Sequence, residues 1–164
     1  MPALVRPDPR DRTLVIEREL LKLALQYPNL LDDGFNQLPV DFFSHPAYRA
    51  VRTSIATAGG IDGLAEDDWI ARVSDHAAND AVRSMIRELA VEPMPIGGGA
   101  LERYGREQLA RAQGQALSRT IEELRSRMQR LETNDADAHA EVFAELVRLE
   151  ADRRVLKEQA YGSD

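Results

Sequence analysis

The sequence predicts an all-α protein, in which a small helical bundle is followed by a long helix and a C-terminal antiparallel helical hairpin. Apolar residues recur at spacings of three and four, which is the period of amphipathic helices. Strand-like runs in which Val, Ile or Thr alternate with polar residues are absent. The 164 residues are 43% hydrophobic but only 5% aromatic, so the core of one or two small units must be modest.

The bundle is expected to occupy residues 1–92. Asp8 and Pro9 are typical of an N-cap and first turn, and the apolar stripe that follows them ends at Pro28. Further helices are expected at residues 46–58, 66–74 and 80–91. Trp69 and the pair Phe42 and Phe43 are interpreted as core anchors, with exposure for partner docking as the alternative.

A linker is expected at residues 93–99, which contain two Pro and three Gly residues. It separates the bundle from a second unit at residues 100–164, which comprises the long helix and the hairpin. Gly114 lies inside the helical pattern of this second unit and is a candidate hinge or kink. Close packing of another helix against this small residue is the alternative interpretation.

The hairpin is predicted from an apolar seam on each of two long helices, because spacings of three and four keep one stripe facing a neighbour. The seam residues are Leu117, Ile121, Leu124, Met128 and Leu131 on the first helix, and Val142, Leu146, Leu149 and Leu156 on the second. Arg153 interrupts the second series. Residues 133–136 supply the polar turn, where Asn134 or Asp135 can accept hydrogen bonds from free amides of the next helix.

A second stripe lies outside this seam and comprises Phe143, Val147, Glu150, Arg154 and Tyr161. A two-helix hairpin has no third element to cover it, so the stripe either packs back on the rest of the domain or contacts a partner. We expect Phe143 and Val147 to act as apolar anchors, Glu150 and Arg154 as orienting charges, and Tyr161 as a terminal contact.

The composition argues against several classes of protein. There is no Cys, and His45, His76 and His139 are scattered, so neither a metal site nor a cofactor is expected. No convergent set of catalytic groups is visible. The net charge of −7 argues against duplex binding. Neither a membrane span nor a secretion signal is visible, so a cytosolic protein is expected.

A family resemblance rests on two segments of the first unit. The helix of residues 19–27 ends at Pro28, and it is followed by the motif Phe42, Phe43, Ser44, His45, Pro46, Ala47, Tyr48 and Arg49. Together they resemble the C-terminal helicase-binding domain of bacterial DNA primase, from about Asp11 onward. The resemblance implies a non-catalytic part of primase, because the zinc-binding and polymerising domains of that family are missing from this chain.

The resemblance also implies partners. The hairpin would bind the N-terminal domain of the hexameric replicative helicase and couple primer synthesis to the fork, and the bundle would modulate the helicase. Family primases can also meet the acidic tail of single-strand-binding protein. The helix of residues 103–130 carries the basic candidates for that tail, Arg119 and Arg125.

Alternatives from other classes stay open at this point. The N-terminal domain of the replicative helicase shares this fold and the same opening motif, and its hairpin would mediate oligomerisation. A scaffold that pairs with itself through the hairpin is a second alternative, and an enzyme is the least supported. The Pro and Gly linker followed by a hairpin at the end of the chain favours primase.

Overall fold

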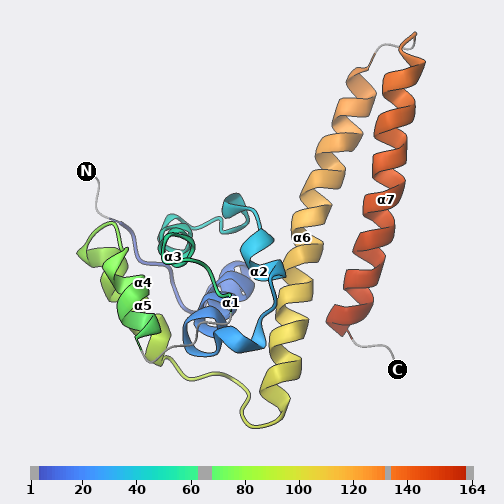
Figure 1. The fold of residues 1–164 in the computed structure, drawn as a ribbon. Helices are drawn as coiled ribbons and strands as arrows, with labels where there is room; N and C mark the ends of the chain where they lie inside the picture. The colour runs from blue at the N-terminus through green and yellow to red at the C-terminus, as the bar shows by residue number, and fades with distance from the viewer. Residues whose placement is uncertain (1–3, 63–67, 132–133, 162–164) are drawn as a thin grey trace.

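The computed structural model describes residues 4–62, 68–131 and 134–161 of the chain. Every regular element in these residues is a helix, which confirms the predicted fold class. Figure 1 shows a bundle formed by the first half of the chain, with two long helices projecting beyond it side by side. The elements are η1 (Arg12–Leu14), α1 (Val15–Gln26), η2 (Pro28–Leu30), α2 (Gly34–Gln37), η3 (Val40–Phe42), α3 (Pro46–Thr57), α4 (Trp69–Asp75), α5 (Asp80–Val91), α6 (Ala100–Arg130) and α7 (Ala136–Tyr161).

The start of the first helix differs from the prediction. Asp8 and Pro9 form a turn, in which the Asp8 carboxylate accepts a hydrogen bond from the Arg10 amide at 2.9 Å. The cap is Asp11, whose carboxylate accepts hydrogen bonds from both the amide and the hydroxyl of Thr13. Because Asp11 makes the more complete cap, the predicted start at Asp8 is wrong, and α1 follows a short 3-10 turn. For the helix predicted at 66–74, the structure describes α4 from Trp69, and residues 66 and 67 lie outside the described residues.

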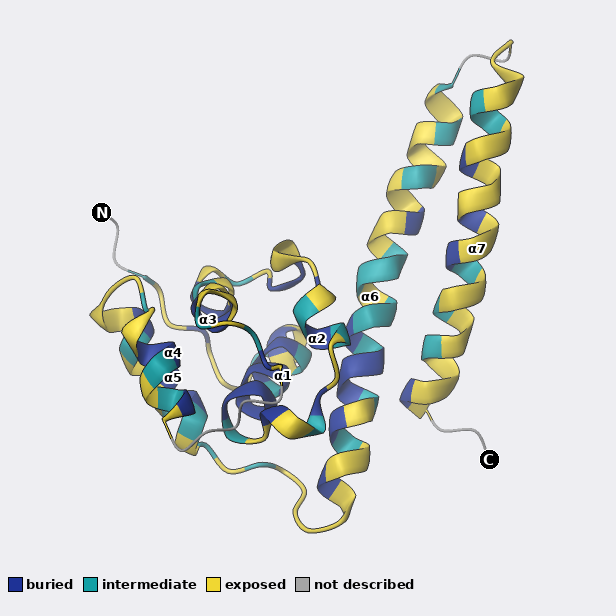
Figure 2. Ribbon diagram, in the orientation of Figure 1, coloured by how far each residue is buried: buried dark blue, intermediate teal, exposed yellow. Residues whose placement is uncertain are grey.

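The core of the bundle forms around α1, which packs against α3, α5 and α6. Leu20, Leu21 and Leu23 are fully buried there, and Figure 2 shows this helix coloured mainly as buried. Phe42, Phe43 and Trp69 are also buried, which confirms their interpretation as core anchors. The indole nitrogen of Trp69 donates to the carbonyl of Ala24 at 3.0 Å, so its polar atom is satisfied inside the core. The further core side chains include Phe35, Tyr48, Val51, Ile55, Val73, Ile86 and Leu89.

A buried network of charges ties α1 to the end of α5. The Arg18 guanidinium donates to both carboxylate oxygens of Glu92, at 2.5 and 2.9 Å, and to the hydroxyl of Tyr48 at 2.9 Å. The Lys22 ammonium lies 3.3 Å from the Glu92 carboxylate and donates to the Pro93 carbonyl at 2.8 Å. This network therefore holds the start of the linker against α1.

Helix α6 packs both in the bundle and in the hairpin. Leu101, Leu109 and Ala112, from its first half, contribute to the core of the bundle. The buried Gly105 lies where α6 passes Leu30 and Leu23. The second half of α6 packs against α7. The division of the chain at residues 93–99 remains a prediction, and the change of packing partner occurs farther along, within α6.

Gly114 lies in this part of α6, and the helix continues through it without interruption. A methyl group added at Gly114 would meet no heavy atom within 4 Å, so the close-packing interpretation of this glycine is wrong. The hinge interpretation remains a prediction.

We expect Gly114→Ala to raise the free energy of unfolding by about 1 kcal/mol, because Ala has the higher helix propensity and the added methyl has room. Urea unfolding followed by circular dichroism measures the change. A destabilised Gly114→Ala protein would contradict this expectation.

Candidate interaction surface of the helical hairpin

The hairpin is held together by a small apolar cluster that is separate from the core of the bundle. Ile121 of α6 is fully buried against Val142, Leu146 and Leu149 of α7. The partly buried side chains packed against this cluster are Leu117, Leu124, Met128 and Leu131. Leu156 is half-buried and lies outside the cluster, so its predicted place in the seam is wrong. At the turn, the Asp135 carboxylate accepts a hydrogen bond from the Ala138 amide at 3.1 Å, as expected of a helix cap.

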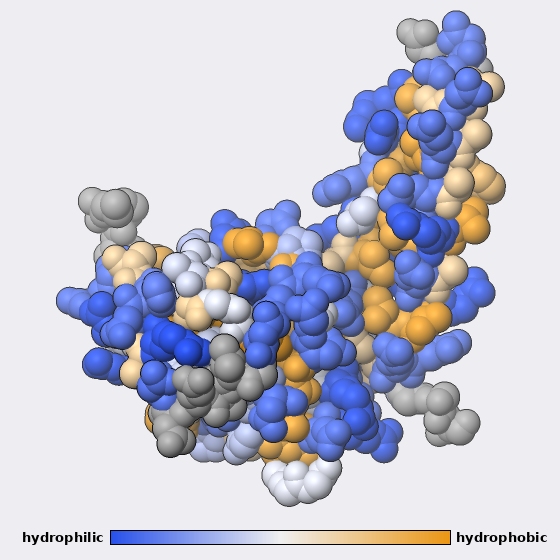
Figure 3. Space-filling view, in the orientation of Figure 1, coloured by the Kyte–Doolittle hydropathy of each residue, from blue (hydrophilic) through white to orange (hydrophobic). Residues whose placement is uncertain are grey.

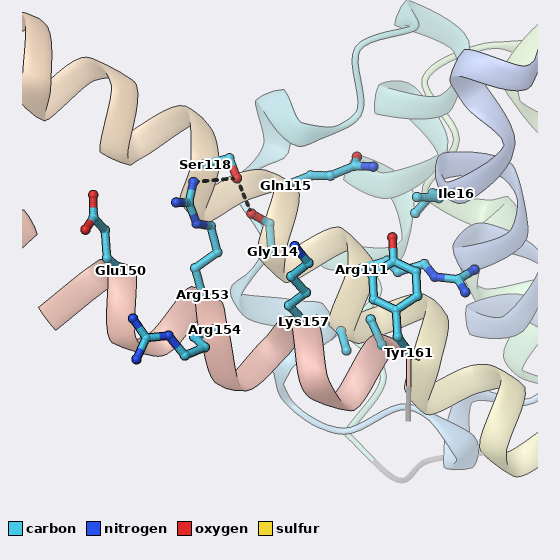
Figure 4. Close-up of a pocket in the computed structure, with 12 residues that line it drawn as sticks. Ile16, Arg111, Gly114, Gln115, Ser118, Glu150, Arg153, Arg154, Lys157 and Tyr161 are labelled. Atoms are coloured by element: carbon cyan, nitrogen blue, oxygen red, sulfur yellow. Dashed lines mark hydrogen bonds between the residues drawn. The ribbon is translucent and has the colours of Figure 1, made fainter. Parts of the chain in front are cut away.

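Arg153, which interrupts the seam in the sequence, reaches across it. Its Nη1 donates to the Ser118 hydroxyl at 3.4 Å, and that hydroxyl donates to the Gly114 carbonyl at 3.0 Å. Figure 4 shows this chain of bonds joining α7 to α6. The apolar seam is therefore continued by polar contacts toward the end of α7.

A second apolar stripe on α7 is exposed. Phe143 and Val147 have 58% and 54% of their surface exposed. Successive residues of a helix are rotated by about 100° around its axis. On α7 the five residues of the predicted stripe therefore lie within about 60° of one another, and the seam lies about 100° around the axis from the stripe. The small exposed neighbours on this side are Ala136, Ala140, Ala144 and Ala151. In Figure 3, apolar surface runs along the side of the hairpin that α7 forms.

The rest of the predicted stripe is polar and borders a pocket between α6 and α7. Glu150, Arg154 and Tyr161 all line this pocket, which has a volume of about 560 Å³. The Tyr161 ring is exposed, and the Arg111 guanidinium lies 5.3 Å from its centre. Glu150 forms an ion pair with Arg125 at 2.5 Å. The stripe is therefore apolar toward the turn of the hairpin and polar toward the end of α7.

The pocket also brings together cations that were not among the predicted interaction residues. Arg111 comes from α6, and Arg153 and Lys157 come from α7 beside Arg154. Glu150 is the one carboxylate among the described lining residues. The run Arg153, Arg154 and Lys157 was a visible signal, because spacings of one, three and four place all three on adjoining faces of a helix. Arg111, more than forty positions earlier in the chain, had no such signal.

The two arginines predicted to meet an acidic tail are not brought together. Arg119 donates to the Asp41 carbonyl at 3.1 Å and lies over the Phe42 ring. Arg125 is bonded to Glu122 and Glu150, and these two carboxylates raise the pKa of its guanidinium, with Glu150 as the larger cause. The two side chains leave α6 about 120° apart. They therefore do not form one anion site.

Two features are absent from the described residues. Within residues 4–62, 68–131 and 134–161, there is no group of three or more His, Asp or Glu side chains placed to hold a metal ion. The same part of the chain contains no helix with the length and apolar character needed to cross a bilayer.

A helical bundle that carries a projecting hairpin with an exposed apolar stripe is typical of a docking domain, a class of protein that works by binding another protein. Comparison with known proteins identifies which one. The chain belongs to the family described as "DNA primase DnaG DnaB-binding", which matches residues 17–147. This family is a non-catalytic part of primase, in agreement with the resemblance seen in the sequence.

Individual relatives agree with the family. The chain is 44% identical over 162 residues to the DNA primase of Mycobacterium tuberculosis, covering 98% of this chain, and 40% identical over 127 residues to that of Streptomyces coelicolor, covering 74% of it. The chain spans about a quarter of the length of the first of these and a fifth of the second. Its structure is similar to the helicase binding domain of primase from Mycobacterium tuberculosis, with a TM-score of 0.82, 41% identity, and coverage of 90% of this chain and 93% of that one. These matches favour primase over the N-terminal domain of the helicase.

Proposed function

We propose that this domain binds the N-terminal domain of the replicative helicase DnaB through the stripe on α7, and so couples primer synthesis to the replication fork. The family match and the similar helicase-binding domain support the partner. The main support for placing the helicase-binding surface on α7 is the exposure of Phe143 and Val147, on a helix that packs mainly along α6. Primer synthesis is proposed for the whole primase, of which this domain would be one part. A cytoplasmic location is also proposed.

The proposed roles follow from the geometry of the stripe. Phe143 and Val147 offer the large apolar area that anchors a typical protein interface, and the alanines around them allow a partner to approach closely. Glu150 and Arg154 lie beside these anchors and would set the orientation of the partner. Tyr161 would add an amphipathic contact at the far end. The bundle supports α6 and is proposed to modulate the helicase after binding.

We expect the double substitution Phe143→Ala and Val147→Ala to weaken helicase binding by about tenfold or more, because it removes both apolar anchors. Isothermal titration calorimetry of the helicase N-terminal domain into this domain measures the change. Both side chains are exposed, so the fold is expected to survive, and circular dichroism checks it.

Val155→Ala is the matched control. Val155 is 52% exposed on the same helix but points about 120° away from Phe143, so its removal should leave binding unchanged. A folded Phe143→Ala, Val147→Ala protein that binds helicase as tightly as the parent would contradict the proposal that this stripe binds the helicase. An intact domain that does not bind helicase at high concentration would overturn the proposed function and favour self-pairing through the hairpin.

The acidic tail of single-strand-binding protein remains a predicted second partner, and Arg119 and Arg125 remain the residues predicted for it. No observation in the structure favours these two positions, because both arginines already bond to neighbouring groups. The absence of duplex binding also remains a prediction, supported by the net charge of −7.

A further inference from the structure

The pocket between α6 and α7 contains more positive charge than the described residues neutralise. Its lining includes Arg111, Arg153, Arg154 and Lys157. Arg154 and Lys157 form no ion pair within the described residues. Among the described lining residues, the only carboxylate is that of Glu150, and it already contacts Arg125. A concave surface lined in this way favours an anionic ligand.

Individual donors in the pocket are also available. The Arg111 guanidinium forms no ion pair within the described residues and lies 5.3 Å from the centre of the Tyr161 ring. Arg153 uses one of its N–H groups on Ser118, and a guanidinium has five. Carboxylates fit such groups well, because a guanidinium can donate two parallel hydrogen bonds to the two oxygens of one carboxylate.

The pocket is continuous with the apolar stripe. Arg154 and Tyr161 leave α7 within about 20° of the direction of Phe143. Between Phe143 and Lys157 the helix rises by about 21 Å, which is the length of four turns of a partner helix. A single partner segment lying along α7 would therefore contact the apolar anchors near one of its ends and the pocket cations near the other.

We propose that the pocket receives carboxylates from an acidic segment of the helicase, whose apolar side chains contact Phe143 and Val147. This inference rests on the proposed function and adds the chemistry of the partner. A protein segment fits this surface better than a nucleic acid strand does. The apolar half of the surface offers nothing to phosphates, and the net charge of the chain is −7.

Lys157 provides a direct test, because the chain contains only two lysines and the other, Lys22, is buried. A carbodiimide joins a lysine amine to a carboxylate that touches it. Treatment of the complex of this domain with the helicase N-terminal domain is expected to link Lys157 to an Asp or Glu of the helicase, identified by mass spectrometry. Lys157→Arg keeps the charge, so it should bind within about twofold of the parent and lose this crosslink.

Charge reversal is the second measurement. Arg154→Glu with Lys157→Glu is expected to weaken helicase binding by about tenfold or more and to reduce its dependence on salt. Arg127→Glu with Arg130→Glu is the matched control. It makes the same change in net charge at exposed positions of α6 outside the pocket, and should leave affinity within about threefold.

The outcomes separate this inference from the function on which it rests. A complex that forms, depends on Phe143 and Val147, and shows neither the Lys157 crosslink nor an effect of pocket reversal would overturn the inference and leave helicase docking in place. The same holds if an acidic tail peptide of single-strand-binding protein binds the pocket while reversal leaves helicase affinity unchanged. If the parent does not bind helicase, both fail.

Discussion

Replacing Ile121 with Asp is expected to release α7 from α6 while the bundle remains folded. Ile121 is the fully buried centre of the cluster that joins the two helices. The substitution removes its apolar contacts and places an unpaired carboxylate among Val142, Leu146 and Leu149. Together these effects should cost about 4 kcal/mol or more of hairpin stability. Because α7 packs mainly along α6, little else holds it in place.

Hydrogen exchange followed by mass spectrometry distinguishes this result from general unfolding. The amides of α7 and of the second half of α6 should lose protection, whereas those of α1 and α3 should keep it. Thr120→Asp is the matched control, since Thr120 is exposed at the adjacent position of the same helix. An Ile121→Asp protein in which α7 remains as protected as in the parent would show that the seam is not what holds the hairpin closed. Loss of helicase binding should accompany the release of α7.

Replacing Glu92 with Ala is expected to destabilise the bundle by about 3 kcal/mol, because it leaves two buried cations without their main partner. The side chains of Arg18 and Lys22 are only 5% and 3% exposed. Glu19 and Glu88 lie close enough to compensate part of the loss, at 2.9 Å from Lys22 and 3.6 Å from Arg18. Urea unfolding measures the change in the free energy of unfolding.

Glu102→Ala serves as the comparison, because it removes an exposed ion pair with Arg106 and should change stability by less than about 1 kcal/mol. Equal effects of the two substitutions would show that the buried network does not stabilise the fold.

The Glu92 network also predicts a dependence of stability on pH. Hydrogen bonds from Arg18 are the main cause that lowers the pKa of the Glu92 carboxyl below its ordinary value of 4.5. A lowered pKa in the folded state means that the stabilisation is fully present above about pH 4.5 and is lost as the pH falls through the folded value. The parent should therefore lose more stability on acidification than Glu92→Ala, and parallel pH profiles would contradict this assignment.

Local sequence patterns determined much of the fold, because helix period, caps and breakers act over a few residues. The series from Leu117 to Leu131 and from Val142 to Leu156 predicted the cluster that joins α6 and α7, except for Leu156, which lies outside it. Pro46 and Asp80 marked the starts of α3 and α5. The error at Asp8 arose because two competing acidic caps lie three residues apart, and only the hydrogen bonds of the folded chain choose between them.

The stripe was also predicted from the spacing of its residues, since residues on one helix face are related by the period of that helix. What the tertiary structure alone decided is where α6 changes its packing partner and which cations meet. Leu109 packs in the bundle and Ile121 in the hairpin, although both belong to one uninterrupted helix. Arg111 reaches the same pocket as Lys157 only because the chain reverses between α6 and α7. Such convergence depends on how two helices lie against each other, which no local spacing specifies.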